Sequence, residues 1–319
     1  GVQTCALPIS IAYAIFNYIR YTGDHAYLAE YGLEVLIGIA RFWSQRVHWS
    51  EVKGAYVMHG VTGPNEYENN VNNNWYTSYI ATWCLRYAME SQAQVKTTSS
   101  AVWETLSKRI AFVESDELSQ WKHIIDHMYY GRQEGTRILL QQDGFLDKEL
   151  RHASNLSDSE RPINQHWSWD RILRSIFIKQ ADVLQGFFFF EDDFSDSQLK
   201  ANFDFYEPKT VHESSLSPCV HSILAAKLGY DEKAYEMYLR TSRLDIDDYN
   251  HEAHEGLHIT SMAGTWMSVT MGFGGMRVKD GELVFNANLP SQWKSYRFNV
   301  LFRGKRYSVF VDASGTRIN

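Results

Sequence analysis

The stretch His59-Gly-Val-Thr-Gly-Pro-Asn-Glu-Tyr-Glu-Asn-Asn-Val-Asn-Asn-Asn-Trp-Tyr76 leads from a loop into a helix. Gly63-Pro64-Asn65 has the composition of a turn, which places Glu66 on an exposed loop. Residues 71–92 then predict a helix, because aromatic residues recur there at every fourth position. These residues are Trp75, Tyr79, Trp83 and Tyr87. The stretch therefore predicts a helical protein whose loops carry polar residues.

A carboxylate beside asparagines and aromatic rings is the composition of a sugar-binding site. Amides hold hydroxyl groups, flat rings stack on a pyranose, and one carboxylic acid can protonate a glycosidic oxygen. The same residues would also suit an asparagine-rich cap on a surface helix. The stretch leaves both interpretations open, with Glu66 as the candidate acid in the first.

Composition argues against several classes of function. Among the 319 residues the formal net charge is -7, so no basic surface for nucleic acid is indicated. The apolar runs are too short to span a membrane. Cys5, Cys84 and Cys219 have neither disulfide nor metal spacing, which fits a reducing cytoplasm. We therefore expect a cytoplasmic protein that binds neither nucleic acid nor membrane, and the 10 Trp, 19 Tyr and 17 Phe suit both core packing and carbohydrate contact.

Helical patterns fill most of the chain between residues 11 and 271. The predicted helices are 11–21, 26–47, 71–92, 100–113, 116–130, 172–189, 217–228 and 232–242, with a loop leading into a last helix over 256–271. Helices of similar length, joined in hairpins with functional loops between them, predict an α/α toroid rather than a compact bundle.

Alternation with period two appears only near the end of the chain. Residues 282–285, 296–302 and 306–311 alternate around Arg303-Gly304-Lys305, which predicts a β-hairpin. We expect residues 11–271 to form an incomplete helical catalytic domain and 272–319 the start of a small, truncated β-sheet domain. Residues 1–10 lack a signal-peptide pattern and resemble a translated sequencing adapter, so we expect them to be a non-native leader of a fragment.

Lys179 and Gln180 interrupt the apolar helix predicted over residues 172–189. A lysine in an apolar segment needs a partner or a ligand, although a snorkelling lysine at a helix edge is the alternative. Ser214 and Ser215 precede the next helix, where they could be ordinary N-caps.

His258, Thr260 and Ser261 lie between two glycines at a predicted helix start. Backbone amides, hydroxyls and an imidazole at that position make a candidate anion site, which the helix dipole would favour. His251 and His254 are three residues apart, whereas the metalloprotease pattern needs four, so we predict no metal site. Asp245 and Asp247 are expected to shape their loop or to pair with Arg243.

Four ordered motifs give the chain a resemblance to a known family. They are His59-Gly-Val-Thr-Gly-Pro-Asn-Glu-Tyr, Phe177-Ile-Lys-Gln-Ala-Asp-Val-Leu, His212-Glu-Ser-Ser-Leu-Ser and Gly256-Leu-His-Ile-Thr-Ser-Met-Ala-Gly-Thr-Trp. From about residue 11 to its end the chain resembles the glycoside hydrolase family 65 disaccharide phosphorylases, and within them the maltose-cleaving members. The resemblance implies a partial (α/α)6 barrel followed by the small β-sheet domain.

The resemblance also implies inverting phosphorolysis of maltose to β-D-glucose 1-phosphate and D-glucose, with phosphate as co-substrate and no metal or organic cofactor. By matching position, Glu66 would be the general acid, and Lys179 and Gln180 would hold the reacting glucose. Phosphate would be held by the remaining matching residues, which are His258, Thr260, Ser261, Ser214 and Ser215. A homodimer is implied for the full-length protein.

Some features depart from the family pattern. The N-terminal sandwich and first barrel helices, with a Trp-Asp pair of the glucose subsite, are absent, and Ile176 replaces an expected proline. We therefore expect the chain alone to be inactive and to aggregate, because an incomplete toroid exposes apolar helix faces. Soluble expression with normal turnover would contradict this.

Three alternatives remain open. The first is phosphorolysis of trehalose, kojibiose or nigerose. The second is inverting hydrolysis, which needs a base about 6.5–9.5 Å from Glu66, with Asp245, Asp247 or Glu255 as candidates. The third is a sugar-binding toroid without activity, which would have no reason to keep the acid, the Lys-Gln pair and the anion loop together.

Overall fold

The computed structural model describes residues 2–319, with side chains described from Ser10 onward. The chain divides into two compact units. The first contains the chain up to Val61 together with Asn70–Gly131, and the second contains Thr62–Asn69 together with Arg132–Asn319. The Glu66 loop therefore belongs to the same unit as every other candidate site residue. Gly1 and the side chains of residues 2–9 lie outside the description, and the non-native leader stays a prediction.

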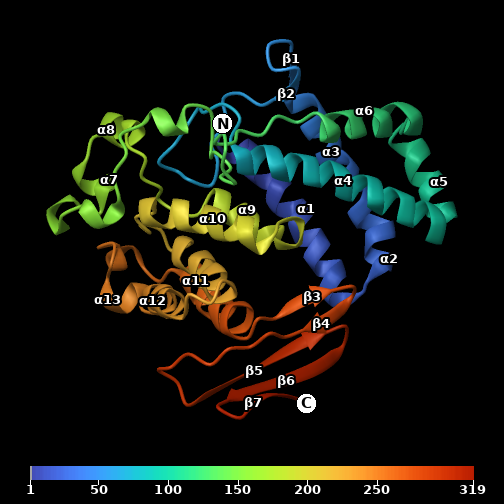
Figure 1. Cartoon of the computed structure of the whole chain (residues 1–319). Coiled ribbons are helices and arrows are strands. Elements are labelled where there is room, and N and C mark those ends of the chain that lie inside the picture. The colour runs from blue at the N-terminus through green and yellow to red at the C-terminus, as the bar shows by residue number, and fades with distance from the viewer. Residues whose placement is uncertain (1) are drawn as a thin grey trace. The chain divides into compact units, whose positions relative to one another are not determined.

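Helices dominate the first unit, where α3 and α4 pack against each other (Figure 1). The helices are α1 (Val2–Thr22), α2 (His25–Tyr27), the π-helical turn η1 (Leu28–Gly32), α3 (Leu33–Arg46), α4 (Trp75–Thr98), α5 (Ser100–Arg109) and α6 (Glu114–Asp126). Helix α4 begins later than predicted because Asn74 caps it, accepting a hydrogen bond from the N–H of Thr77. A short antiparallel hairpin of β1 (His48–Ser50) and β2 (Ala55–Val57) was not predicted, since three-residue strands show no clear alternation.

The aromatic stripe on α4 serves mainly to pack the first unit. Trp75 and Tyr79 stack with ring centroids 5.0 Å apart, and Trp83 and Tyr87 stack at 5.3 Å. Trp83 also meets Phe16 of α1 edge to face at 5.4 Å. The stripe was predicted correctly as one face of a helix, and its rings contact each other and a neighbouring helix.

The second unit contains shorter helices joined by longer loops (Figure 1). Its α-helices are α7 (Ile163–His166), α8 (Trp169–Arg174), α9 (Val183–Phe189), α10 (Asp196–Tyr206), α11 (Ser217–Lys227), α12 (Asp231–Ser242), α13 (Leu244–Asp247) and α14 (Ile259–Met267). Its other helical turns are η2 (Phe145–Asp147), η3 (Ala153–Asn155), η4 (Asp158–Glu160), η5 (Glu191–Asp193), η6 (Glu207–Lys209), η7 (Ala253–Glu255) and η8 (Ser268–Phe273).

The helix predicted over residues 172–189 is wrong. Helix α8 ends at Arg174 and α9 begins at Val183, so Lys179 and Gln180 lie in an irregular segment between them. Backbone groups of this segment pair with distant residues: the N–H of Ile178 donates to Lys209, and the carbonyl of Ile178 accepts from Val211. A fully apolar run does not distinguish a buried helix from a buried extended segment. Helix α10 was missed, although Leu199, Asn202, Phe203 and Tyr206 form its buried face at helical spacing.

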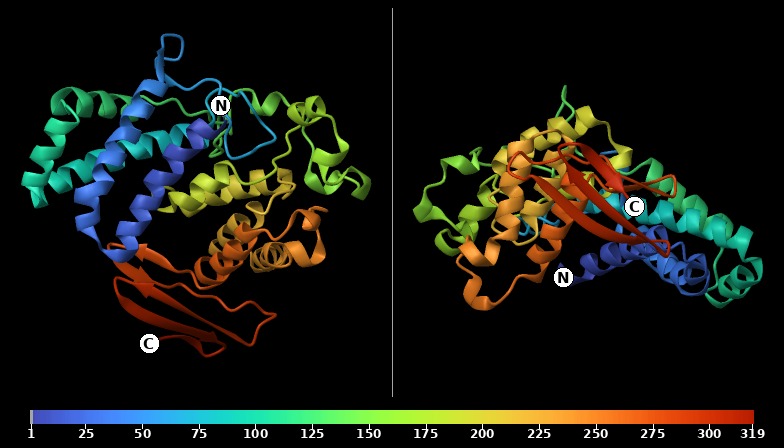
Figure 2. Two further views of the ribbon diagram at one scale, coloured as in Figure 1. Left: turned by 180° about the vertical axis from the view of Figure 1, so that it is seen from behind. Right: turned by 90° about the horizontal axis from the view of Figure 1, so that it is seen from below.

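The antiparallel strands at the end of the chain confirm the predicted hairpin (Figure 2). The strands are β3 (Arg277–Lys279), β4 (Glu282–Val284), β5 (Ser295–Phe302), β6 (Lys305–Asp312) and β7 (Gly315–Ile318). Buried and exposed residues alternate along β5, and Phe302 pairs with Lys305 across the turn. Arg303 and Gly304 both have positive φ, which a two-residue turn joining twisted strands requires.

Close packing of α14 requires a glycine. A Cβ added to Gly264 would lie 2.8 Å from the Cβ of Cys219 in α11 and 3.2 Å from Thr241 in α12. We expect Gly264→Ala to lower the free energy of unfolding by about 1–3 kcal/mol, as overpacked cores do. Gly38→Ala in α3 is the matched control, since a Cβ there meets nothing within 4 Å and a helix favours alanine. Equal losses for both variants in urea unfolding would contradict the packing argument.

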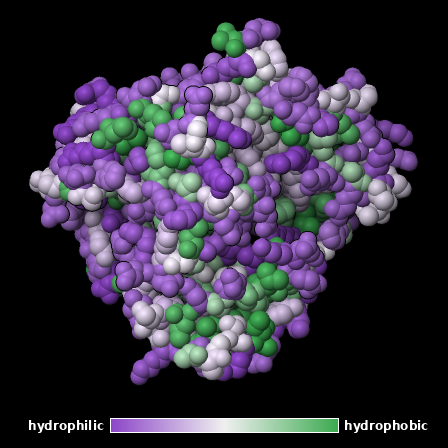
Figure 3. Space-filling view, viewed as in Figure 1, coloured by the Kyte–Doolittle hydropathy of each residue, from purple (hydrophilic) through white to green (hydrophobic). Residues whose placement is uncertain are grey.

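Apolar side chains are exposed along α14. Ile259, Met262 and Trp266 share one face of the helix and are 68%, 46% and 49% exposed. On the face shown in Figure 3, hydrophobic residues occur in separate groups among hydrophilic ones. That an incomplete toroid exposes apolar helix faces, and that the chain aggregates, both stay predictions. Among the described residues, no helix is both long and apolar enough to cross a membrane.

Candidate active site

Asn65 fixes the loop that carries Glu66. Its side chain is fully buried, and its Oδ1 accepts hydrogen bonds from the backbone N–H of Tyr67 at 3.2 Å and of Lys179 at 2.9 Å. The backbone N–H of Asn65 donates to Asp182 Oδ2 at 3.0 Å. Asn65 therefore joins the Glu66 loop to the irregular segment before α9. The sequence indicated only a turn residue here, because Lys179 and Asp182 are more than a hundred positions away.

The structure brings Glu66, Lys179 and Gln180 together. Lys179 Nζ lies 2.7 Å from Glu66 Oε2, and the Glu66 side chain is 56% exposed. Gln180 Nε2 donates to the carbonyl of Pro64 at 2.8 Å, while its Oε1 is buried without a hydrogen-bond partner. An exposed carboxylate beside an ammonium and an unpaired amide oxygen is suited to hold a hydroxylated ligand.

Tyr67 and Glu68, the two residues after Glu66, anchor the loop to other parts of the second unit. Tyr67 is buried, and its hydroxyl donates to Glu213 Oε2 at 2.6 Å. Glu68 is also buried and pairs with Lys148. Burial raises the pKa of Glu68, and Lys148 acts against that rise. Of the two glutamates in this loop, Glu66 is the one that can meet a substrate.

Tyr67 packs within a buried hydrophobic cluster of the second unit. Its other members are Ala153, Leu156, Ile163, Trp167, Ile172, Phe177 and Val211. Val211 leads directly into the segment that carries Glu213 and the two candidate serines. The Tyr67–Glu213 hydrogen bond therefore connects the loop of the candidate acid to the serine segment.

The candidate phosphate residues form a second cluster around the start of α14. Ser215 Oγ lies 2.7 Å from Thr260 Oγ1, so these hydroxyls, 45 positions apart, are brought together. Ser214 Oγ accepts a hydrogen bond from the backbone N–H of Leu216. Ser261 is buried, and its hydroxyl donates to the carbonyl of His258 at 2.8 Å. Its proton is therefore already used, which makes Ser261 a weaker donor to an anion than Ser215 or Thr260.

His258 is held by Asp245. The Nδ1 of His258 lies 2.6 Å from Asp245 Oδ1, and its backbone N–H donates to Oδ2 at 3.0 Å. The hydrogen bond from His258 lowers the pKa of Asp245. Of the two roles expected for Asp245, shaping its loop and pairing with Arg243, the structure shows the first, because Asp245 holds the backbone and the imidazole of His258.

Asp247, by contrast, does pair with Arg243. Both oxygens of Asp247 accept hydrogen bonds from the guanidinium, at 2.7 and 2.6 Å, and this contact lowers the pKa of Asp247. A base that activates water must present an unengaged carboxylate oxygen to it. Asp245 and Asp247 are thus poor candidates for the base of a hydrolase.

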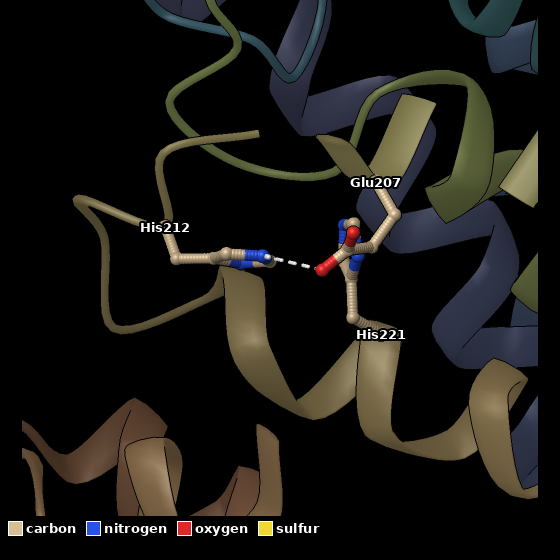
Figure 4. Close-up of side chains that lie close together, drawn as sticks. All are labelled: Glu207, His212 and His221. Carbon is tan, nitrogen blue, oxygen red and sulfur yellow. Dashed lines mark ion pairs between the residues drawn. The ribbon is translucent and has the colours of Figure 1, made fainter. Parts of the chain in front are cut away.

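The buried imidazoles of His212 and His221 lie close to the half-buried carboxylate of Glu207 (Figure 4). Among the described residues, Glu207, His212 and His221 are the one group whose possible metal ligands lie within 4.8 Å of one another. Glu207 Oε1 lies 4.0 Å from His212 Nε2, and Lys233 Nζ already lies 3.0 Å from the same oxygen. Neighbouring ligands on a tetrahedral zinc ion are roughly 3.3 Å apart, so this spacing is too wide for a preformed site. His251 and His254 do not belong to the group.

Both imidazoles of this group are held in the neutral form. Burial lowers the pKa of His212 and lowers that of His221 well below the usual value of 6.5. Burial alone would raise the pKa of Glu207, but the Lys233 ammonium, 3.0 Å from Oε1, acts against this and the pKa is lowered. Within the part of the chain that the structure describes, neither nitrogen of His221 has a hydrogen-bond partner. Protonating either imidazole in the folded state would therefore place a new charge in a buried site.

Stability should consequently fall in mild acid. The unfolded chain takes up a proton on His221 as the pH drops below about 6.5, whereas the folded chain does not. Between about pH 7 and pH 5 this difference removes about 2 kcal/mol of stability. Urea unfolding of His221→Gln at both pH values should show a correspondingly smaller loss than the parent protein. An unchanged loss in the variant would show that His221 is not buried in the neutral form.

Comparison with known proteins identifies the family. A profile of the glycosyl hydrolase family 65 central catalytic domain matches residues 2–267, and one of the family's C-terminal domain matches 276–319. The chain is 52% identical over 303 residues to maltose phosphorylase of Bacillus subtilis (strain 168), covering 95% of this chain and 39% of the relative. It is 39% identical over 310 residues to alpha,alpha-trehalose phosphorylase of Thermoanaerobacter brockii, covering 97% of this chain and 40% of that protein. The chain thus spans about two fifths of the length of these relatives.

A solved structure shows the same fold. The putative kojibiose phosphorylase from human microbiome superimposes with a TM-score of 0.90 at 36% sequence identity, over 98% of this chain and 45% of that one. This likeness confirms the predicted fold class, a mainly helical chain with part of an (α/α)6 barrel and a small antiparallel β-sheet domain. The family profiles and the relatives confirm the resemblance seen in the sequence. The chain belongs to glycosyl hydrolase family 65.

Proposed function

We propose that the protein cleaves an α-linked glucose disaccharide with inorganic phosphate, and that maltose is its substrate. The observation that carries the proposal is the pairing of one exposed acid, Glu66, with Lys179, on a loop joined through Tyr67 and Glu213 to the serine segment. The relatives named as maltose, trehalose and kojibiose phosphorylases support the reaction class. Maltose is favoured by the 52% identity to a maltose phosphorylase.

In the proposed reaction Glu66 donates a proton to the glycosidic oxygen as the bond to the anomeric carbon breaks. A phosphate oxygen forms the new bond to that carbon from the opposite face, so the products are β-D-glucose 1-phosphate and glucose. Phosphate is already an anionic nucleophile and needs no base to activate it. This agrees with Asp245 and Asp247 being engaged with His258 and Arg243. Before the proton is transferred, the Lys179 ammonium must leave Glu66 and bind a glucose hydroxyl instead.

Phosphate would lie against Ser214, Ser215 and Thr260, with His258 and Ser261 behind them. Thr260 and Ser261 belong to the first turn of α14, and the positive end of a helix dipole favours an anion there. The proposal includes no metal or organic cofactor, a cytoplasmic location and a homodimer of the full-length protein. Light scattering on that protein tests the last of these.

Phosphate dependence tests the proposal directly. The full-length protein is incubated with maltose, with and without inorganic phosphate, while free glucose and β-D-glucose 1-phosphate are measured. We expect equal amounts of the two products, formed only when phosphate is present. Free glucose formed at the same rate without phosphate would identify a hydrolase instead. Parallel reactions with trehalose, kojibiose and nigerose decide the linkage.

A further inference from the structure

A pocket of about 310 Å³ lies beside the serine segment, and the proposed reaction does not use it. Its lining residues are Arg161, Pro162, Glu213, Arg240, Tyr249 and Asn250. They come from the turn before α7, the segment before α11, the end of α12 and the loop after α13. All of them belong to the second unit.

Several buried polar atoms of the pocket residues have no hydrogen-bond partner among the described residues. These atoms are Glu213 Oε1, Arg240 Nε, and the Nδ2 and Oδ1 of Asn250. Glu213 and Asn250 are each only 3% exposed. Buried polar groups of folded proteins are nearly always paired, so this concentration of unpaired donors and acceptors points to a polar ligand in the pocket.

The charges of the pocket favour an anion. Burial lowers the pKa of Arg240, and the nearby Arg161 guanidinium lowers it further. Glu213 attracts both guanidiniums, but burial raises its pKa. Its Oε2 already accepts hydrogen bonds from Tyr67 and from the backbone N–H of Ile163, and its Oε1 accepts none. The carboxylate therefore does not close an ion-pair network with the two arginines.

The other ionisable groups near Arg240 do not change this balance. Glu236 and Tyr249 also favour the charged form of Arg240, more weakly than Glu213 does. Arg240 Nη2 donates hydrogen bonds to the carbonyls of Val211 and His212, both at 3.2 Å. Its Nε is left for a ligand. Two guanidiniums beside one carboxyl group present the hydrogen-bond donors that bind a tetrahedral oxyanion.

We propose that this pocket binds a phosphate group, with Arg161 and Arg240 as the charged donors and the Asn250 amide as a neutral donor. The choice of phosphate among oxyanions rests on the proposed function, whereas the anion site itself does not. The hydroxyl cluster at α14 contains no lysine or arginine, and its imidazole is paired with Asp245. The pocket adjoins that cluster through the peptide bond between Glu213 and Ser214. It supplies positive charge next to the hydroxyls that would hold the reacting phosphate.

Equilibrium binding of inorganic phosphate tests the pocket without any turnover. Titration calorimetry of the full-length protein should give saturable binding, and Arg161→Gln should weaken it roughly tenfold or more. Asn250→Asp keeps the shape of the side chain, breaks no side-chain hydrogen bond and adds a negative charge, so it should weaken binding at least as much. It also carries the test if Arg161→Gln does not fold. Arg174→Gln is the matched control, since Arg174 is exposed and pairs only with Asp170 at the surface.

The outcomes separate the pocket from the proposed function. Unchanged phosphate affinity in both pocket variants, or no saturable binding to the parent protein, would overturn the pocket. If binding is lost in Thr260→Val and kept in both pocket variants, the pocket fails while the proposed function survives. If the pocket variants lose phosphate binding and the parent protein does not cleave maltose, the pocket stands and the proposed function fails. Repeating the titration with glucose 1-phosphate shows whether the group comes from free phosphate or from the ester, and either source supports the site.

Discussion

Glu66→Gln should lose maltose phosphorolysis by roughly a thousandfold, the middle of the range for removing a general acid. Glutamine keeps the size of the side chain and can still accept a hydrogen bond from Lys179, which lies 2.7 Å from Oε2. The lost property is the proton that the glycosidic oxygen needs as it leaves. The measurement is kcat for maltose with saturating phosphate, with Glu134→Gln as an exposed control.

A substrate that needs no proton separates catalysis from binding. Fluoride leaves α-D-glucosyl fluoride without protonation, so Glu66→Gln should cleave this substrate with phosphate far better than it cleaves maltose. The product should again be β-D-glucose 1-phosphate. An equal loss on both substrates would mean that Glu66 positions the sugar rather than protonating the leaving group.

Lys179→Met should lower kcat/KM for maltose by roughly a hundredfold. Its ammonium is proposed to move from Glu66 to a glucose hydroxyl, and a hydrogen bond to a charged group is worth about 1.5–3 kcal/mol. Methionine keeps the apolar stem and the backbone N–H that donates to Asn65 Oδ1, so the loop should keep its structure. The comparison is steady-state kinetics of the variant and of Lys200→Met, an exposed lysine of α10.

The matched test of the scaffold is Asn65→Ala. It removes the acceptor of the Tyr67 and Lys179 amides, so it should lower stability as well as activity, whereas Lys179→Met should lower activity alone. Unfolding in urea distinguishes the two. A large stability loss in Lys179→Met would show that its ammonium supports the fold rather than the substrate.

The sequence identified individual residues of the candidate site but not how they are arranged in space. Glu66, Lys179 and Gln180 were identified from motifs, and the structure places Lys179 against Glu66 although the predicted helix around it does not exist. Ser215 and Thr260 were each identified and do meet. The anchoring role of Asn65 was missed, because the sequence showed only its suitability for a turn.

What the sequence determined by itself is local. Aromatic residues at every fourth position predicted α4, and alternation around Arg303-Gly304 predicted the pairing of β5 with β6, because both signals lie within a single element or a tight turn. Composition also pointed to the acid loop, and the four ordered motifs gave the resemblance to the family.

Tertiary structure alone decided which distant segments meet. The backbone of residues 175–182 pairs with loops elsewhere in the chain, Tyr67 reaches Glu213 across 146 positions, and Arg161 and Arg240 share one pocket. None of these contacts produces a periodic pattern in the sequence, because each depends on how the helices pack. The physical reason is that a repeat reports which face of one segment is buried, whereas the partner of a buried polar group is fixed only when the whole unit closes around it.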